Sequence, residues 1–296
     1  MNLRNFLRIF TLSLLVTAIL VLPSLAGFPI KIVDDRGKEI TITKKPERIV
    51  IAGAALYAEI LVDLGAAGRV VGITDSADNP PEFARTEKLG NIFAPNIEKI
   101  IALKPDLVIG SFGKPRDALE IAGLIVLTTP AIDGSVDVFK TIRSIGLAID
   151  GETQKTDSLV GKFSESIVTD EAKVIELPRP SVAILYPSPE SPPFAAGAST
   201  PENEIVLRAG GQNSFTDFTQ YKQVNFEEII KRNPDIILTD PSQISLITSN
   251  RFLKETKAVK TGKVFGVKAS SWTSSRIANT LRGVAKLFHP DAFKEK

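Results

Sequence analysis

The sequence predicts an α/β protein built from two similar lobes. Three observations lead to this fold class. A segment of 15 residues recurs once along the chain, each copy combines a short helix with a buried strand, and a long helical pattern without proline lies between the copies. With 296 residues, 43% of them hydrophobic, the chain has an ordinary globular composition and enough length for two lobes.

The repeat occupies positions 96–110 (NIEKIIALKPDLVIG) and 225–239 (NFEEIIKRNPDIILT). Six of its 15 positions are identical without a gap. In each copy Asn is a good helix N-cap, Glu falls in the first helical turn, and Pro ends the helix. An apolar run follows, as expected for a parallel strand that is covered on both faces. Each copy therefore predicts a helix, a Pro-Asp turn and a buried strand.

The other expected elements complete the lobes in chain order. The first part of the chain predicts a β-hairpin, three strands and a helix, at 30–33 with 40–43, 48–52, 69–73, 125–127 and 57–64. The second part predicts two strands and two helices, at 181–186, 263–267, 204–209 and 274–288. Strands that alternate with helices indicate mainly parallel sheets, so we expect each lobe to be Rossmann-like, with a ligand cleft between the lobes.

A single long rigid helix is expected to join the lobes. Leu159, Phe163 and Ile167 recur every four residues and indicate a helix near 157–175. A helix of about 20 residues spans roughly 30 Å, so it would be a stiff link. The chain is accordingly divided into a signal peptide, an N-terminal lobe, a connecting helix, and a C-terminal lobe with a closing helix, at 1–26, 27–152, 153–178 and 179–296.

The first 26 residues have the pattern of a cleaved secretory signal peptide. Arg4 and Arg8 precede an apolar stretch at 9–22, and Ser24-Leu25-Ala26 is a small-x-small cleavage pattern. The stretch is shorter than the roughly 20 residues of a membrane span. No cysteine follows it for lipid attachment. We therefore expect a periplasmic protein without a lipid anchor.

Composition excludes several kinds of chemistry. The chain has no cysteine and one histidine, His289, which excludes a disulfide scaffold, a Cys-ligated metal, a thiol nucleophile and a His cluster. Lys and Arg total 36 against 34 acidic residues, so nothing indicates a nucleic-acid partner. No G-x-S-x-G, H-E-x-x-H, P-loop or G-x-G-x-x-G motif is present. We expect a protein that is not an enzyme and holds no cofactor or metal of its own.

Further fragments occur in a characteristic order: PERIV at 46–50, RVVG at 69–72, PPF at 192–194, GGQN at 210–213 and SW at 271–272. Together with the repeat, they make the chain resemble the metal-chelate-type solute-binding proteins of ABC importers, which include vitamin B12-binding and iron-siderophore-binding proteins. The resemblance implies a periplasmic monomer that captures a ferric siderophore or cobalamin-type chelate and delivers it to a membrane permease. Siderophore, corrinoid and haem all remain open as ligands. A secreted α/β hydrolase, or a ligand-sensing lobe for a membrane receptor, is the alternative.

Glu98 and Glu227 occupy the same position in the two copies of the repeat. In the family that the chain resembles, one Glu on each lobe docks into Arg pockets of the permease, and these two residues match those positions. The alternative is that each Glu only stabilises the positive end of its helix, by about 0.3–1 kcal/mol.

Ligand-binding candidates lie where loops follow the predicted strands, because ligands of open α/β sheets bind at that edge. Aromatic side chains offer large, stiff faces to a bulky chelate, and Arg pairs with carboxylates or phosphate. The candidates are Tyr57, Phe112, Tyr186, Phe194, Trp272 and Arg276. Trp272 also falls where the B12-binding proteins that the chain resembles have a cleft tryptophan. His289, beside Pro290, is expected to cap a helix end rather than to bind metal.

Overall fold

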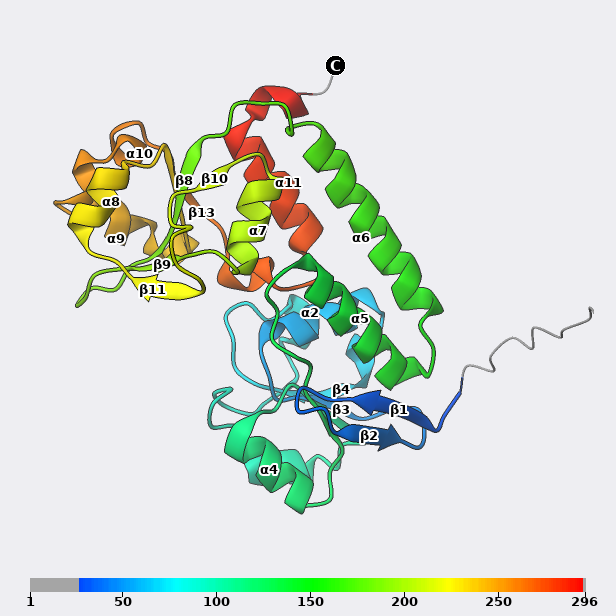
Figure 1. Cartoon of the computed structure of the whole chain (residues 1–296). Helices are drawn as coiled ribbons and strands as arrows, with labels where there is room; N and C mark the ends of the chain where they lie inside the picture. The colour runs from blue at the N-terminus through cyan, green and yellow to red at the C-terminus, as the bar shows by residue number, and fades with distance from the viewer. Residues whose placement is uncertain (1–26, 295–296) are drawn as a thin grey trace, which may run out of the picture.

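The computed structural model describes residues 27–294 and shows two α/β lobes (Figure 1). The predicted signal peptide, residues 1–26, lies outside the described residues. Within the described part, no helix has the length and apolar character needed to cross a membrane. The chain begins with the expected hairpin, in which β1 (Ile30–Val33) pairs antiparallel with β2 (Glu39–Ile42).

The N-terminal lobe contains a five-stranded sheet in the order β5-β4-β3-β6-β7, with every strand parallel to its neighbours. Its strands are β3 (Ile49–Ile51), β4 (Val70–Ile73), β5 (Glu87–Lys88), β6 (Leu107–Ile109) and β7 (Val126–Leu127). Its helices are α2 (Ala55–Asp63), α3 (Ile97–Ala102) and α4 (Gly113–Ile121). The parallel sheet confirms the predicted fold class for this lobe.

The C-terminal lobe has a six-stranded sheet in which β8 is the branching strand. Parallel pairs join β8 to β10 and β12, and β12 to β13, whereas β9 and β11 extend the sheet antiparallel. Its strands are β8 (Ser181–Tyr186), β9 (Phe194–Ala196), β10 (Gln212–Asn213), β11 (Tyr221–Gln223), β12 (Ile236–Thr239) and β13 (Val264–Gly266). Its helices are α7 (Pro201–Arg208), α8 (Phe226–Arg232), α9 (Ile244–Thr248), α10 (Lys257–Lys260) and α11 (Ile277–Phe288).

Short 3-10 helices connect several of these elements. They are η1 (Ala67–Arg69), η2 (Pro81–Phe83), η3 (Pro241–Gln243), η4 (Leu253–Glu255), η5 (Ala269–Trp272) and η6 (Pro290–Phe293). Of these, η5 leads from β13 towards α11 and contacts α2 of the N-terminal lobe.

Two consecutive helices, rather than one, lie between the sheets. They are α5 (Ser135–Asp150) and α6 (Gln154–Ala172), and α6 runs along one side of the molecule towards the C-terminal lobe (Figure 1). Gly151 separates them, because its positive φ of 73° ends α5 and its N–H donates to the Leu147 carbonyl. The expected single linking helix is therefore not confirmed, and α6 ends before residue 178. The lobe boundaries at 152 and 178 stay predictions.

The sequence repeat gives the same local structure in both lobes. The Asn96 side chain accepts a hydrogen bond from Lys99 N at 2.9 Å, and that of Asn225 accepts one from Glu228 N at 2.7 Å. Both N-cap predictions are thereby confirmed.

The repeated aspartates also have matching roles. Asp106 accepts a hydrogen bond from Arg48 N at 3.0 Å, and Asp235 accepts one from Ser181 N at 2.8 Å, so each carboxylate holds the start of the neighbouring strand. Hydrogen bonds from Lys44 and Lys257 lower the pKa values of Asp106 and Asp235 respectively.

One hydrophobic core extends through both lobes. In β3 and β6, Ile49, Ile51, Leu107 and Ile109 face it, and in β8 and β12 so do Val182, Ile184, Ile236 and Leu238. The residues between them point to the opposite face of each sheet, as the two-residue period of a strand requires. Val50 and Val108 therefore join a separate cluster of the N-terminal lobe, and Ala183 and Ile237 join one of the C-terminal lobe.

Polar contacts also tie the lobes together. Glu204 of α7 accepts hydrogen bonds from Ser135 N at 2.8 Å and Ser135 Oγ at 2.5 Å, at the start of α5. Arg208, one helical turn further along α7, forms an ion pair with Glu171 of α6 at 3.0 Å. Ser275 donates a hydrogen bond to Asp63 at the end of α2. These contacts fix the C-terminal lobe against α2, α5 and α6.

Candidate ligand-binding site and docking surface

A pocket of about 420 Å³ lies at the carboxyl ends of the N-terminal strands. Its lining comes from the loops and helix starts that follow β3, β5, β6 and β7, together with one residue of the C-terminal lobe. The lining residues are Ala54, Leu56, Tyr57, Ile92, Gly110, Phe112, Thr128, Thr129, Pro130, Ala131, Ile132 and Thr273. Because Thr273 comes from the segment after η5, the pocket lies where the two lobes meet. This is the edge at which open α/β sheets bind ligands.

Two predicted residues, Tyr57 and Phe112, line this pocket. Tyr57 is only 7% exposed, and its hydroxyl oxygen lies 3.0 Å from Thr129 Oγ1. Its ring lies close to the backbone of Gly110, where a Cβ would approach it to 2.5 Å. Gly110 is therefore required for Tyr57 to pack at the pocket base. Phe112 is more accessible and packs edge-on against the exposed Phe93, with ring centroids 5.8 Å apart.

The other two predicted tyrosine and phenylalanine residues lie on the C-terminal lobe. Tyr186 ends β8, and Phe194 begins β9 directly beside it in the antiparallel register. Phe194 is exposed, whereas Tyr186 is partly buried and packs edge-on against Tyr221 of β11, with ring centroids 6.1 Å apart. The strands β9 and β11 lie on the side of this lobe that faces the N-terminal lobe (Figure 1).

Burial and a nearby carboxylate keep the tyrosines protonated. Burial raises the pKa of Tyr57 above its usual value, and burial together with the negative charge of Glu202 raises the pKa values of Tyr186 and Tyr221. These are the three tyrosines of the sequence.

The folded protein is therefore expected to show less than half of its full phenolate absorbance at pH 10, where an ordinary tyrosine is half ionised. Since unfolding returns the phenols to an ordinary pKa, their contribution to stability is intact below pH 10 and is lost as the pH rises above it. Ultraviolet titration of native and guanidinium-unfolded protein checks this, with Tyr186→Phe/Tyr221→Phe as the control that weakens the effect. Half-ionisation at pH 10 in the native protein would contradict it.

Trp272 is not an accessible cleft residue in this structure. It is 2% exposed and belongs to the core cluster that both lobes share. The polar neighbours on which its prediction depended do not prevent burial, because η5 turns the indole inward while Thr273 reaches the pocket. Its position at the lobe junction fits the expected location, but its side chain packs as core.

Arg276 lies beside carboxylates of the protein itself, whereas an arginine that binds a ligand would point into the pocket. Its guanidinium lies 3.6 Å from Asp63 and 3.9 Å from Glu59, both on α2. Glu59 is 8% exposed, and burial raises its pKa although the charge of Arg276 lowers it. Arg276 thus faces two carboxylates across the lobe junction, and it does not line the pocket of about 420 Å³.

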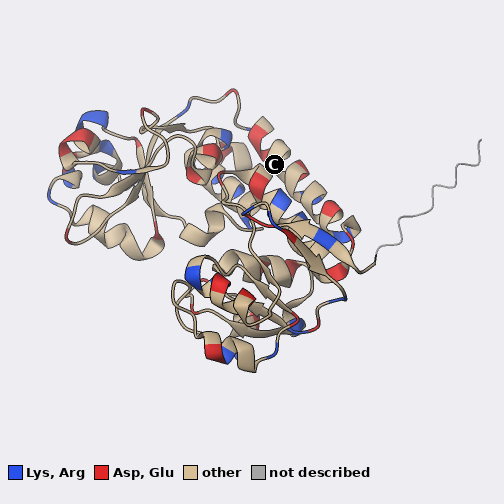
Figure 2. Ribbon diagram, turned by 60° about the horizontal axis from the view of Figure 1, so that its bottom comes forward, with Lys and Arg blue, Asp and Glu red and all other residues tan. Residues whose placement is uncertain are grey.

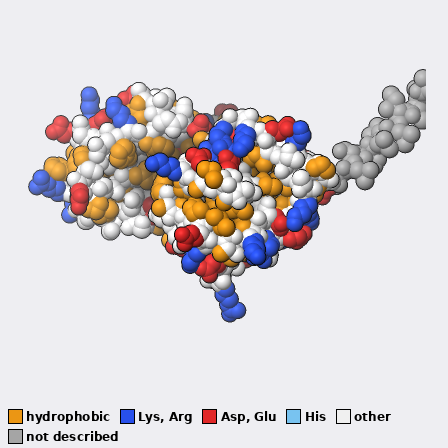
Figure 3. Space-filling view, turned by 90° about the horizontal axis from the view of Figure 1, so that it is seen from below, with side chains coloured by type: hydrophobic (Ala, Val, Ile, Leu, Met, Phe, Trp, Pro, Cys, Tyr) orange, Lys and Arg blue, Asp and Glu red, His pale blue; other side chains and the backbone are white. Residues whose placement is uncertain are grey.

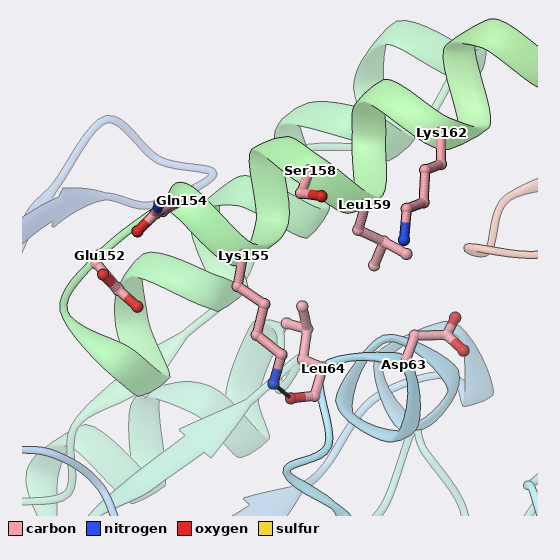
Figure 4. A pocket seen from close by; sticks show the side chains of 8 residues that line it. All are labelled: Asp63, Leu64, Glu152, Gln154, Lys155, Ser158, Leu159 and Lys162. Atoms are coloured by element: carbon pink, nitrogen blue, oxygen red, sulfur yellow. Dashed lines mark hydrogen bonds between the residues drawn. The ribbon is translucent and has the colours of Figure 1, made fainter.

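A second hollow, of about 380 Å³, lies between the end of α2 and the start of α6 (Figure 4). Lys155 crosses it and donates a hydrogen bond to the Leu64 carbonyl, and Lys162 lines it near Asp63. Its lining residues come from the end of α2, the first half of α6 and the turn before α6, and not from strand ends. This second hollow is therefore a groove where α2 packs against the α5–α6 pair.

The two repeat glutamates are both exposed in the first turns of short helices. Glu98 lies on α3 and Glu227 on α8, one in each lobe. Neither forms an ion pair with any residue in the described range 27–294, whereas the neighbouring Lys99 and Glu228 do. Both carboxylates are therefore open to an external cation.

Charged residues are distributed without one dominant patch. Figure 2 shows basic and acidic residues interspersed over both lobes, in keeping with 36 basic and 34 acidic residues. Figure 3 shows a face of the molecule on which hydrophobic side chains gather near the centre with charged side chains around them.

Sequence reasoning missed several residues that the structure brings to this region. The loop 128–132 lines the pocket, although its position directly after a predicted strand was a sufficient signal. Phe93, Glu202 and Tyr221 were also missed. No local signal marks them, because Phe93 reaches the site by packing on Phe112, and Glu202 and Tyr221 reach it through the folding of α7 and β11.

Comparison with known proteins identifies the class. The family described as periplasmic binding protein matches residues 50–270, which is more than half of the chain. The chain belongs to this family of periplasmic binding proteins.

Two curated relatives are informative. An uncharacterized ABC transporter substrate-binding lipoprotein, YvrC of Bacillus subtilis, is 32% identical over 90% of this chain and 88% of its own length. The vitamin B12-binding protein of Vibrio parahaemolyticus is 25% identical over 87% of this chain and 94% of its own length. One relative is named a substrate-binding protein of an ABC transporter and the other a vitamin B12-binding protein, and this chain is likewise a substrate-binding transport protein and not an enzyme.

Solved structures confirm the fold. The periplasmic heme-binding protein RhuT from Roseiflexus matches with a TM-score of 0.76 and 23% identity, covering 83% of this chain and 99% of that one. An ABC-type Fe3+-hydroxamate transport system structure from Saccharomonospora viridis matches with a TM-score of 0.75 and 22% identity, covering 88% and 99%.

The comparison with the Bacillus protein also corrects one prediction. That relative is named a lipoprotein, which implies a lipid anchor and contradicts our prediction of a periplasmic protein without one. The prediction depended only on the absence of a cysteine after the apolar stretch, and this relative overturns it.

Proposed function

We propose that this protein is the substrate-binding component of an ABC importer, and that it captures a metal chelate of the ferric siderophore or corrinoid type and delivers it to the membrane permease. The pocket of about 420 Å³ at the lobe junction carries this proposal. Its volume falls in the range of small-molecule sites, roughly 300–1,000 Å³. Its lining is mostly apolar with a few hydroxyl groups, as suits a bulky organic ligand.

The rest of the binding surface comes from the C-terminal lobe. Tyr186, Phe194 and Tyr221 add aromatic faces on the side that faces the pocket. A chelate held between Phe112 on one lobe and these rings on the other would be enclosed by stiff side chains, which lose little conformational entropy on binding.

Delivery would use the two exposed glutamates. Glu98 and Glu227 stand on separate lobes and have no ion-pair partner among residues 27–294. A permease with one cationic site for each could recognise their spacing, and a monomeric receptor presents one such pair. Coupling of close interfacial charge pairs amounts to about 1.5–7 kcal/mol, which exceeds the benefit of a carboxylate at a helix start.

Isothermal titration calorimetry tests the proposed ligand class. Cobalamin, dicyanocobinamide, ferrioxamine B, a ferric catecholate and haemin are titrated into the protein, and at least one is expected to bind with a Kd in the micromolar range or below. Phe112→Ala is expected to weaken that binding about tenfold, through loss of an aromatic contact of roughly 1.4 kcal/mol.

Phe252→Ala is the matched control, because Phe252 is 40% exposed, close to the 38% of Phe112, but packs on Phe226 of α8. The Phe252→Ala variant should bind the same compound with the affinity of the unaltered protein. If none of the five compounds shows measurable binding, the proposed function is contradicted.

A further inference from the structure

Glu202 is a buried carboxylate that holds two tyrosines on the C-terminal lobe. It is 3% exposed and lies in the first turn of α7. Tyr186 donates to Glu202 Oε1 at 2.5 Å, and Tyr221 donates to the two carboxylate oxygens at 3.0 and 2.9 Å. Glu202 forms no ion pair within residues 27–294, so the two phenols are its hydrogen-bond donors there.

This group lies on the side of the lobe that faces the pocket. Tyr186 is at the carboxyl end of the central strand β8, and Tyr221 starts β11, with β9 between the two strands. Asp133, in the loop that precedes α5, lies near enough to contribute to raising the pKa of Tyr221. Tyr221 is nevertheless 45% exposed, so it is available to a ligand that enters between the lobes.

The hydrogen bonds determine what the two phenols can offer. Each hydroxyl has one proton, and both protons are directed to Glu202, so each oxygen retains lone pairs that accept hydrogen bonds. The negative charge of Glu202 also raises the pKa values of both phenols, which disfavours a phenolate. The pair therefore accepts hydrogen bonds from a ligand but is poorly suited to donate its oxygen as a metal ligand.

That property separates siderophores and corrinoids from haem, the third ligand that the sequence leaves open. Haem iron takes an axial side chain from the protein, by His, Cys, Met or Tyr. The chain has no cysteine, and its single methionine, Met1, lies in the predicted signal peptide. His289 is 9% exposed and lies against the Gly210 carbonyl at the end of α11, roughly 18 Å along that helix from the lobe junction. The hydroxyl of Tyr57, the remaining tyrosine, is engaged in a hydrogen bond with Thr129 Oγ1.

We propose that Tyr186, Glu202 and Tyr221 form the C-terminal wall of the ligand cleft and select a chelate whose metal is fully coordinated by its own organic ligand. The proposal rests on the proposed function. The preferred ligand carries hydrogen-bond donors, such as amide N–H groups, towards the two phenol oxygens, and haem is rejected for want of an axial ligand. Glu202 is a positioning residue in this arrangement, because it acts through the tyrosines.

Competitive binding tests this selectivity. Dicyanocobinamide and ferrioxamine B represent saturated chelates, and haemin represents one with open axial positions. The unaltered protein is expected to bind one of the saturated chelates at least 100-fold more tightly than haemin. Glu202→Gln keeps the shape but removes the charge, and is expected to weaken that chelate about tenfold. Tyr221→Phe removes only the hydroxyl of an exposed ring and should weaken binding of the same chelate by a similar factor. This second variant keeps the test valid if Glu202→Gln does not fold.

Glu176→Gln is the matched control, because Glu176 is exposed and follows α6, away from the cleft; it should leave affinity unchanged. Haemin binding as tightly as the saturated chelates, with a visible spectrum of tyrosine-ligated haem, would overturn the proposal. Affinity within twofold of the original in both Glu202→Gln and Tyr221→Phe would also overturn it. If no compound of the five-member panel binds, the proposed function itself fails, and this inference fails with it.

Discussion

Replacing both Glu98 and Glu227 by Arg is expected to reduce transport into cells or vesicles by at least about 100-fold, while ligand affinity stays within about threefold. Each carboxylate is exposed, unpaired within residues 27–294 and located on a helix of its own lobe. Losing two interfacial charge pairs at a minimum of about 1.5 kcal/mol each gives the 100-fold loss. Neither residue lines the pocket, so capture of the ligand should be preserved.

The matched control reverses two other exposed glutamates that form no ion pair within residues 27–294, Glu165 of α6 and Glu176 just beyond it. Glu165→Arg/Glu176→Arg changes the net charge by the same amount, and transport should remain within about twofold. Transport is measured with labelled ligand and reconstituted permease, and affinity by calorimetry. Equal losses in the two double variants would show a general charge effect, and affinity falling together with transport would place the repeat glutamates in the ligand site.

Trp272→Ala is expected to lower the free energy of unfolding by about 3–5 kcal/mol, the usual cost of removing a large aromatic side chain from a core. Trp272 is among the largest fully buried side chains of the described chain, and it packs in the cluster to which both sheets contribute. Chemical denaturation followed by circular dichroism measures the change.

Phe93→Ala is the control, because Phe93 is 70% exposed; its cost should stay below about 0.5 kcal/mol. A Trp272→Ala variant that keeps its stability but loses ligand affinity tenfold would restore the sequence-based view of Trp272 as a cleft residue. Comparing the two variants thus separates a packing role from a binding role.

Much of the fold could be predicted because it depends on local signals. Asn caps, Pro stops and apolar runs located α3, β6, α8 and β12 from the repeat alone. The antiparallel strands β9 and β11 were not predicted, since they are short and their pairing depends on residues distant in sequence. The helix α5 was also not predicted, so the segment between the sheets contains two helices where one was expected.

The candidate site was predicted only where it follows strand ends. Tyr57 and Phe112 come directly after strands and do line the pocket. Arg276 and Trp272 satisfied the same rule, but one faces carboxylates of α2 and the other is buried, which depends on how the lobes meet. Glu202 lies in a helix, where an acidic residue in the first turn is unremarkable, so its two tyrosine partners could not be inferred from sequence.

The core that runs through both lobes has a thermodynamic consequence. Two-lobed chains with separate cores can lose one lobe while the other stays native, which gives two unfolding transitions. Here alternate residues of β3, β6, β8 and β12 contribute to one apolar cluster, together with Ile142 of α5 and Leu281 of α11. Melting either sheet would expose the inner face of the other. We therefore expect the molecule to unfold in one cooperative transition rather than lobe by lobe.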